Sequence, residues 1–206
     1  MDSPLIIGDA LRRNAAKYPL KIAVRDCLRE VTYGELNDRV NRLANSLLSR
    51  GIRKNDPVAL LVGNRIEHLE IVFALAKIGA LAIPLDVKWR ALEVASTLAS
   101  FKPVLMFAEP GCLEEFTAAT KQQAALHAIS TAILDEKSYK ALVENSKREE
   151  PKVEVGESDS FMVLITSGTT GFPKGCVSSQ RTYVLHCINN AIEKGLGVHD
   201  RAPLSS

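Results

Sequence analysis

Apolar residues along this chain follow two spacings that alternate through most of its length. Continuous apolar runs predict strands that are buried on both faces, and apolar residues repeated every three or four positions predict helices with one buried side. The strands are expected at 58–62, 81–83, 104–108 and 161–165, and the helices at about 36–47, 69–76 and 92–100. This alternation indicates an α/β fold with a mainly parallel sheet, and right-handed connections place helices on both of its faces.

Short-range signals add detail near the N-terminus. Asp9 is expected to cap a short helix that ends before Pro19. Two apolar segments separated by polar residues predict a small antiparallel hairpin within 22–33. Thr32 and Glu35 have the spacing of a capping box, in which each side chain accepts the other residue's backbone N–H, so the helix over 36–47 is expected to begin there.

The middle of the chain has weaker patterns. Between 111 and 134 we expect one or two helices and a short strand at 132–134. Residues 147–159 are charged, include Pro151 and Gly156, and have the composition of a linker. The expected organisation is an N-terminal α/β subdomain over 1–146, a linker over 147–159, and the start of a second α/β subdomain over 160–206.

Composition and charge exclude several classes of protein. Of the 206 residues, 46% are hydrophobic and 24% are charged, which disfavours both a disordered chain and a membrane protein. The net charge of +2 is too even for a nucleic-acid-binding surface. The N-terminus lacks the features of a secretory signal, and the most apolar stretch, 71–85, is short for a membrane span. We expect a cytoplasmic protein, and a homo-oligomer is compatible with the sequence.

Four cysteines are widely scattered and form no C-x-x-C pair. In a cytosolic protein they are expected to be reduced and mostly buried. Cys176, His186 and Cys187 are close in sequence, but their spacing matches no zinc pattern, so we interpret them as core residues and expect no metal held by protein ligands.

The residues with the clearest chemistry directly follow the last predicted strand, in the sequence TSGTTGFPKG over 166–175. These ten positions contain three Thr, one Ser, three Gly and one Lys. Glycines allow backbone N–H groups to approach an anion closely, and hydroxyl groups donate hydrogen bonds to phosphate oxygens. Lys174 adds a compact positive charge. The segment therefore predicts a phosphate-binding loop.

A plain hairpin turn and a Walker-type loop are two other interpretations of this segment. A plain hairpin turn needs two to five residues and gains nothing from several hydroxyl groups and a lysine. A Walker-type loop needs G-x-x-x-x-G-K-[ST] leading directly into a helix. Pro173 stands where the second glycine of that pattern belongs, and Gly175 stands where it requires Ser or Thr. Both interpretations are disfavoured.

The loop resembles, residue for residue, the phosphate-loop motif T-S-G-[ST]-T-G-x-P-K-G of the adenylate-forming superfamily, which includes acyl-CoA and aryl-CoA synthetases. Two earlier segments are also similar to this family: VTYGEL at 31–36, and LAKIGA at 75–80 followed by IPLD at 83–86. All three occur in the family's order, so the resemblance covers nearly the whole chain. Gln180 is a departure, because many members have a histidine there, and we assign it no catalytic role.

The resemblance implies an AMP-forming ligase. A carboxylic acid attacks the α-phosphate of ATP, pyrophosphate leaves, and coenzyme A takes the acyl group; Mg²⁺ ordinarily bridges the phosphates. The residues that match the family's phosphate-binding motif are Thr166, Ser167, Gly168, Thr169, Thr170, Gly171 and Lys174. Lys174 is expected to stabilise charge on the departing pyrophosphate. The acid is not defined by these residues.

Family members are longer than this chain, and their adenine-binding, Mg²⁺-binding and acyl-binding residues lie further along. The sequence is therefore expected to represent an N-terminal portion of such an enzyme, inactive by itself. Two alternatives stay open. One is an adenylation domain that loads a carrier-protein thiol, and the other is a non-catalytic anion-binding or interaction domain.

Overall fold

A six-stranded sheet forms the centre of the molecule. The computed structural model describes residues 4–166, 174–197 and 200–202. Within them the strand order is β6-β5-β3-β4-β7-β8; β8 pairs antiparallel with β7, and every other pair is parallel. The strands are β3 (Pro57–Leu61), β4 (Leu81–Pro84), β5 (Leu105–Ala108), β6 (Ser130–Ile133), β7 (Ser160–Thr166) and β8 (Lys174–Ser179).

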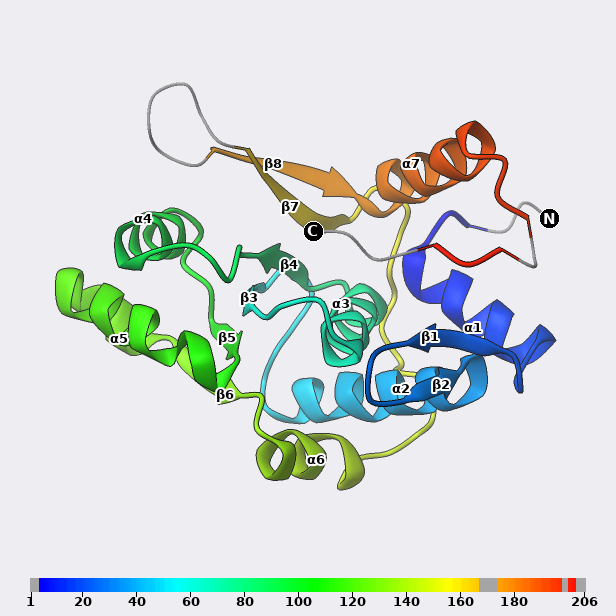
Figure 1. Ribbon diagram of the computed structural model, residues 1–206, viewed down its shortest axis with the longest axis horizontal. Coiled ribbons are helices and arrows are strands. Elements are labelled where there is room, and N and C mark those ends of the chain that lie inside the picture. The colour runs from blue at the N-terminus through cyan, green and yellow to red at the C-terminus, as the bar shows by residue number, and fades with distance from the viewer. Residues whose placement is uncertain (1–3, 167–173, 198–199, 203–206) are drawn as a thin grey trace.

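Helices cover both faces of this sheet (Figure 1). One face carries α1 (Ile7–Lys17), α2 (Tyr33–Ser49), α3 (Ile66–Ile78), α6 (Glu136–Glu144) and α7 (Gln180–Glu193), and the other carries α4 (Ala91–Phe101) and α5 (Leu113–Gln122). Alternate residues of β3 serve the two faces: Val58 and Leu60 join the α2–α3 side of the core, whereas Ala59 and Leu61 join the α4–α5 side. This is the pattern of a strand buried on both sides.

The predicted fold class is confirmed, as are several local signals. The N-terminal hairpin consists of β1 (Ile22–Arg25) and β2 (Glu30–Thr32), which pair antiparallel. Both halves of the capping box are present, since Thr32 Oγ1 accepts the N–H of Glu35 and Glu35 Oε2 accepts the N–H of Thr32. Gly79 ends α3 with a φ of 68°, a left-handed conformation that favours glycine.

The prediction that Asp9 caps the first helix is wrong. Helix α1 begins two residues earlier, and Asp9 lies in its first turn, where its carboxylate accepts a hydrogen bond from Arg12. The backbone N–H groups at this helix start are bonded instead by residues from the far end of the chain. Glu157 accepts the N–H of Leu5, and the side chain of Gln180 accepts the N–H of Ile7. Local sequence contains no sign of such distant partners.

Helix α6 was not predicted, and the segment after it, which was predicted to be a linker, is bound to the rest of the protein. Residues 147–155 contain no helix or strand, yet side chains of α2 bind this segment closely. Asn41 donates to the carbonyl of Arg148, and Asn45 donates to the carbonyls of Lys147 and Glu149. These two asparagines lie one helical turn apart, so they follow the extended chain along one side of the helix. The predicted subdomain boundary within 147–159 stays a prediction.

The buried ammonium group of Lys77 also binds the segment 147–155. Lys77 Nζ donates to Asn37 Oδ1 at 2.7 Å, to Asn41 Oδ1 at 2.7 Å and to Glu150 Oε2 at 2.6 Å. Burial opposes ionisation of Glu150, but hydrogen bonds from Lys77 and Asn37 outweigh it and lower the pKa of that carboxyl. Burial also lowers the pKa of Lys77, against the effect of Glu150. The pair therefore ties the crossing segment to both α2 and α3.

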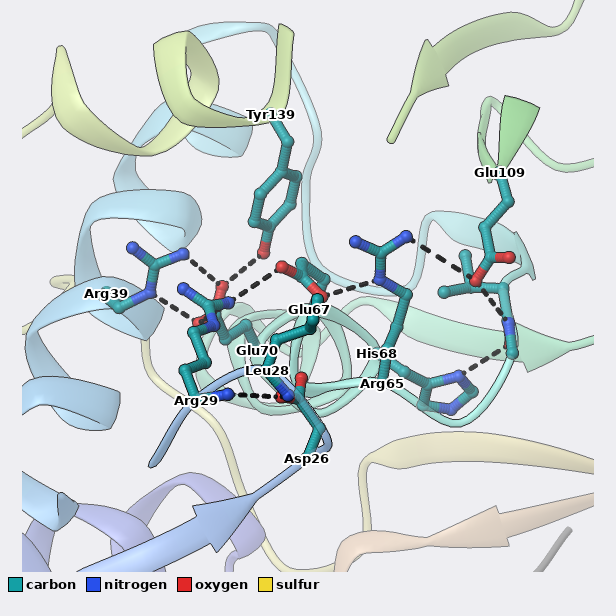
Figure 2. A network of polar contacts seen from close by, with 12 residues as sticks. Asp26, Leu28, Arg29, Arg39, Arg65, Glu67, His68, Glu70, Glu109 and Tyr139 are labelled. Atoms are coloured by element: carbon teal, nitrogen blue, oxygen red, sulfur yellow. Dashed lines mark hydrogen bonds and ion pairs between the residues drawn. The ribbon is translucent and has the colours of Figure 1, made fainter. Parts of the chain in front are cut away.

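A second polar network lies between α2, α3 and α6 (Figure 2). The fully buried carboxylate of Glu70 binds Arg39 through two hydrogen bonds, of 2.5 and 3.0 Å, and accepts the hydroxyl of Tyr139 at 2.7 Å. Burial, together with the neighbouring charge of Glu70, raises the pKa of Tyr139 well above its usual value. The buried carboxylate of Glu70 therefore has a cationic partner and a hydroxyl donor, which offset the cost of burying it.

Two further expectations concerned cysteines and membranes. Cys112 is buried, but Cys27, Cys176 and Cys187 are exposed, so the prediction of mostly buried thiols is wrong. The interpretation of Cys176, His186 and Cys187 as core residues is wrong for the same reason, because all three are exposed on β8 and α7. In the part of the chain that the structure describes, no helix is both long and apolar enough to span a bilayer.

Replacing Glu150 by Gln tests the tie to Lys77. The folded-state pKa of Glu150 is depressed, so its contribution is present above the unfolded pKa of about 4.3 and is lost as pH falls through the folded value. We expect Glu150→Gln to lower the free energy of unfolding by about 1 kcal/mol at pH 7. The free energy of unfolding of this variant should also fall less steeply than that of the unsubstituted protein as the pH drops below about 4.3. Urea denaturation at several pH values measures both. Glu149→Gln, at a neighbouring exposed carboxylate, should change neither, and equal effects in the two variants would contradict the assignment.

Candidate phosphate-binding site

The described ends of the predicted phosphate loop lie opposite each other. Thr166 is the last residue of β7, Lys174 is the first residue of β8, and the two are partners in the antiparallel ladder. The hydroxyl of Thr166 donates to the carbonyl of Lys174 at 3.3 Å, and both side chains are exposed. Five of the predicted site residues lie outside the described residues: Ser167, Gly168, Thr169, Thr170 and Gly171.

The position in the sheet suits a ligand. Strand β7 runs parallel to β4, so Thr166 lies at the edge where the parallel strands have their carboxyl ends. Open α/β sheets bind their ligands outside that edge. A cation and a hydroxyl group at the two ends of one loop are suitable donors for a phosphate group.

The topology argues against the Walker interpretation of the loop. A Walker-type lysine is followed by a helix, whereas Lys174 begins a strand. The connection does join two antiparallel strands, as the hairpin interpretation supposed. It contains the seven residues 167–173, however, which is longer than a tight turn.

Gly175 sets the position of Lys174 from the side of α4. A Cβ atom at Gly175 would collide with the ring of Phe101 and would lie 2.6 Å from Cγ1 of Val163. The ring of Phe101 therefore packs directly on the backbone of β8, one residue after Lys174. Only glycine permits this close approach, which explains a requirement for glycine after the lysine.

Gln180 fixes the other end of β8. It is the first residue of α7, is fully buried, and uses both ends of its side-chain amide. Oε1 accepts the N–H of Ile7 at 3.1 Å, and Nε2 donates to the carbonyl of Ala76 at 3.3 Å. Sequence reasoning noted Gln180 only as a departure from a family pattern. A polar residue directly after a strand gave no signal of burial.

The groups on either side of the loop are chemically suited to a nucleotide cofactor. The ammonium of Lys174 and the hydroxyl of Thr166 fit the phosphates of a nucleotide. Within the described ranges, no group of three His, Cys, Asp or Glu residues is arranged to hold a metal ion. An ATP-bound Mg²⁺ does not require such a group, since phosphates and water supply most of its ligands.

Comparisons with known proteins agree on one family. The model of the family described as AMP-binding enzyme matches residues 11–204. Indoleacetate–CoA ligase of Aromatoleum aromaticum is 32% identical over 95% of this chain and 39% of its own length. The long-chain-fatty-acid–CoA ligase FadD13 of Mycobacterium tuberculosis is 33% identical over 85% of this chain and 35% of its own. The chain thus spans little more than a third of these relatives.

A solved structure supports the same grouping. The fold of a fatty acyl-CoA synthetase from Mycobacterium tuberculosis superposes with a TM-score of 0.78 and 28% identity, covering 85% of this chain and 35% of that one.

Gly175→Ala tests the packing under Lys174. The added methyl group forces Phe101 or β8 to move, and overpacking of this kind costs about 1–3 kcal/mol. We expect a lower midpoint of thermal unfolding. Gly111→Ala is a matched control, because no atom lies within 4 Å of a Cβ placed there. Adding Phe101→Leu to Gly175→Ala should restore part of the loss. Additive destabilisation in the double variant would contradict a direct clash.

Proposed function

Because this chain belongs to the family of AMP-binding enzymes, we propose that it acts in an ATP-dependent ligase, which activates a carboxylic acid as an acyl-adenylate and transfers the acyl group to coenzyme A. The observation that supports this most directly is the placement of Lys174 opposite Thr166 at the carboxyl end of β7. A flexible nucleotide tail can be held there by a cation and by hydroxyl and amide donors.

The proposed role of Lys174 follows from where charge develops. When the carboxylate attacks the α-phosphate, the bond to pyrophosphate breaks and negative charge grows on the departing oxygens. A fixed ammonium group at this point stabilises the transition state more than the ground state. Ser167, Thr169 and Thr170 would donate hydroxyl hydrogen bonds, and Thr166 would do so after its hydroxyl turns from the carbonyl of Lys174 to the ligand. Gly168 and Gly171 would let backbone N–H groups approach. Mg²⁺ bound with ATP would neutralise further charge.

The acid and the cellular setting are proposed only in outline. The relatives named above act, by their names, on indoleacetate and on long-chain fatty acids, so an aryl or a fatty acid is a reasonable substrate class. We also propose a cytoplasmic location. The proposed organisation is an N-terminal subdomain over 1–146, a linker over 147–159, and the beginning of the next subdomain over 160–206.

Substitution of Lys174 tests the proposal. In the full-length protein, Lys174→Ala should reduce kcat for CoA-dependent AMP release roughly 10²- to 10³-fold, as expected for loss of one transition-state donor. Lys194→Ala, at an exposed lysine beyond α7, serves as the control and should leave the rate unchanged. Unaltered AMP release by Lys174→Ala would exclude the role given to this lysine. Absence of any acid-dependent AMP release by the unsubstituted protein would favour a non-catalytic anion-binding domain.

A polypeptide of these 206 residues alone is expected to be inactive, since it spans only 35–39% of the length of the matched ligases. We expect no ATP–pyrophosphate exchange above background when it is assayed with a panel of aryl and fatty acids. Exchange at the rate of an intact ligase would show that all activating groups lie within this chain.

A further inference from the structure

The ends of two helices meet at the side chain of Gln180. The first N–H groups of a helix and its last carbonyl groups lack partners within the helix. Ile7 is the first residue of α1, and Ala76 lies in the last turn of α3. The amide of Gln180 accepts the N–H of Ile7 and donates to the carbonyl of Ala76, which also accepts the N–H of Gly79 at 3.4 Å. The backbone N–H of Gln180 donates to the carbonyl of Asp159, just before β7. Four segments distant in sequence are thereby joined at one residue.

Strand β8 is held mainly by its ladder with β7. Among the described residues it is the edge strand of the sheet, and β7 is the one strand with which it pairs. Most of its residues are exposed, and Gln180 is the one buried residue of α7 within the described part of that helix. Packing holds both ends of β8 within the described residues. Gly175 lies under Phe101 at one end, and Gln180 lies between α1 and α3 at the other. Beside Gln180, Arg181 pairs with Glu157 and Tyr183 packs on Phe161.

We propose that Gln180 is a positioning residue, which holds β8 in register on β7 and so fixes where Lys174 meets its ligand. This role rests on the proposed function only for its effect on catalysis, since the effect on β8 itself is independent of any activity. Gln180 is not expected to touch the nucleotide, because it lies at the opposite end of the strand from Lys174.

The chemistry of an amide explains the choice of residue. The site needs one donor, toward Ala76, and one acceptor, toward Ile7, and a carboxamide supplies both without titrating. A glutamate of the same shape loses the donor when ionised and recovers it when protonated. A histidine supplies donor and acceptor only when neutral, since both of its nitrogens donate when it is charged. The two substitutions should therefore fail at opposite ends of the pH range.

Other charged groups near this point are paired. Glu157 accepts the N–H of Leu5 and pairs with Arg181, and Asp159 pairs with Lys54. Their hydrogen bonds lower the pKa of both carboxyls, so they stay ionised above about pH 5. On the α1 and α3 side, Lys77 packs against Gly8 and pairs with Glu150, and Asp9 pairs with Arg12. Comparison with the unsubstituted protein at each pH removes their contribution.

Hydrogen exchange of the apo protein tests the effect on β8. For Gln180→Glu, amides of 174–179 should exchange at least about tenfold faster than in the unsubstituted protein at pH 8, and the difference should shrink toward pH 5.5. Gln180→His should show the reverse, with the larger difference at pH 5.5. Gln123→Glu, at a half-buried glutamine after α5, controls for added charge and should leave β8 unchanged. Faster exchange confined to the start of α1 would reduce Gln180 to a local helix cap and overturn the proposal.

Kinetics of the full-length protein tests the consequence for the ligand. At temperatures well below unfolding, Gln180→Glu should lower kcat about tenfold at pH 8, with recovery toward pH 6, because it displaces a group that stabilises the transition state. A merely structural role would lower the midpoint of unfolding and leave kcat unchanged, which would overturn the positioning role. If the unsubstituted protein shows no ATP–pyrophosphate exchange, the proposed function fails, and hydrogen exchange of β8 alone decides the role of Gln180.

Discussion

The ends of helices impose a requirement that this chain meets through distant side chains. Unpaired N–H and carbonyl groups at a buried helix end cost free energy unless a partner is present. Gln180 supplies partners for α1 and α3 at once, and Glu157 supplies another for the residues before α1. The N-terminal helix, the core helix α3 and the strand after the phosphate loop therefore depend on one another. A change in any of them alters the attachment of the strand that begins with Lys174.

Where partners lie close in sequence, the fold could be predicted. The capping box of Thr32 and Glu35 spans three residues, and the left-handed glycine at 79 directly follows its helix. Continuous apolar runs predict the buried strands. Strand β3 is an example, because helices cover both of its faces and every position must therefore be apolar. These signals are complete within a window of a few residues, and they were sufficient to give the α/β class, the hairpin and the mainly parallel sheet.

Where partners lie far apart, no comparable signal is present in the local sequence. The N–H of Ile7 is bonded by a residue 173 positions away, so a local cap at Asp9 was expected instead. The charged segment after α6 was predicted to be a linker. Lys77 and the asparagines of α2, which are more than 70 positions away in sequence, bind it. For the candidate site, residue types and spacing predicted Thr166 and Lys174 as phosphate-binding residues, and this stays a prediction. The supports at Gly175 and Gln180 depend on packing that only the folded chain reveals.

Two positions at the carboxyl edge of the sheet could bind an anionic ligand: the loops after β3 and β5, and the end of β7. At the first position the donor groups already bind a carboxylate of the protein. The connection after β3 runs toward β4, and the connection after β5 runs in the opposite direction, toward β6. Such a switch point between two neighbouring strands normally opens a crevice. Here Glu109 accepts the N–H of Gly63 at 2.8 Å, and Arg65 lies 4.0 Å from the same carboxylate oxygen (Figure 2). The backbone donor and the cation that could receive an anion there already face an internal carboxylate. The end of β7 differs, because the side chains of Thr166 and Lys174 are exposed and Lys174 has no ion-pair partner among the described residues. The physical distinction between the two places is the presence or absence of an internal anion, and it favours binding of a nucleotide's phosphates beside Lys174.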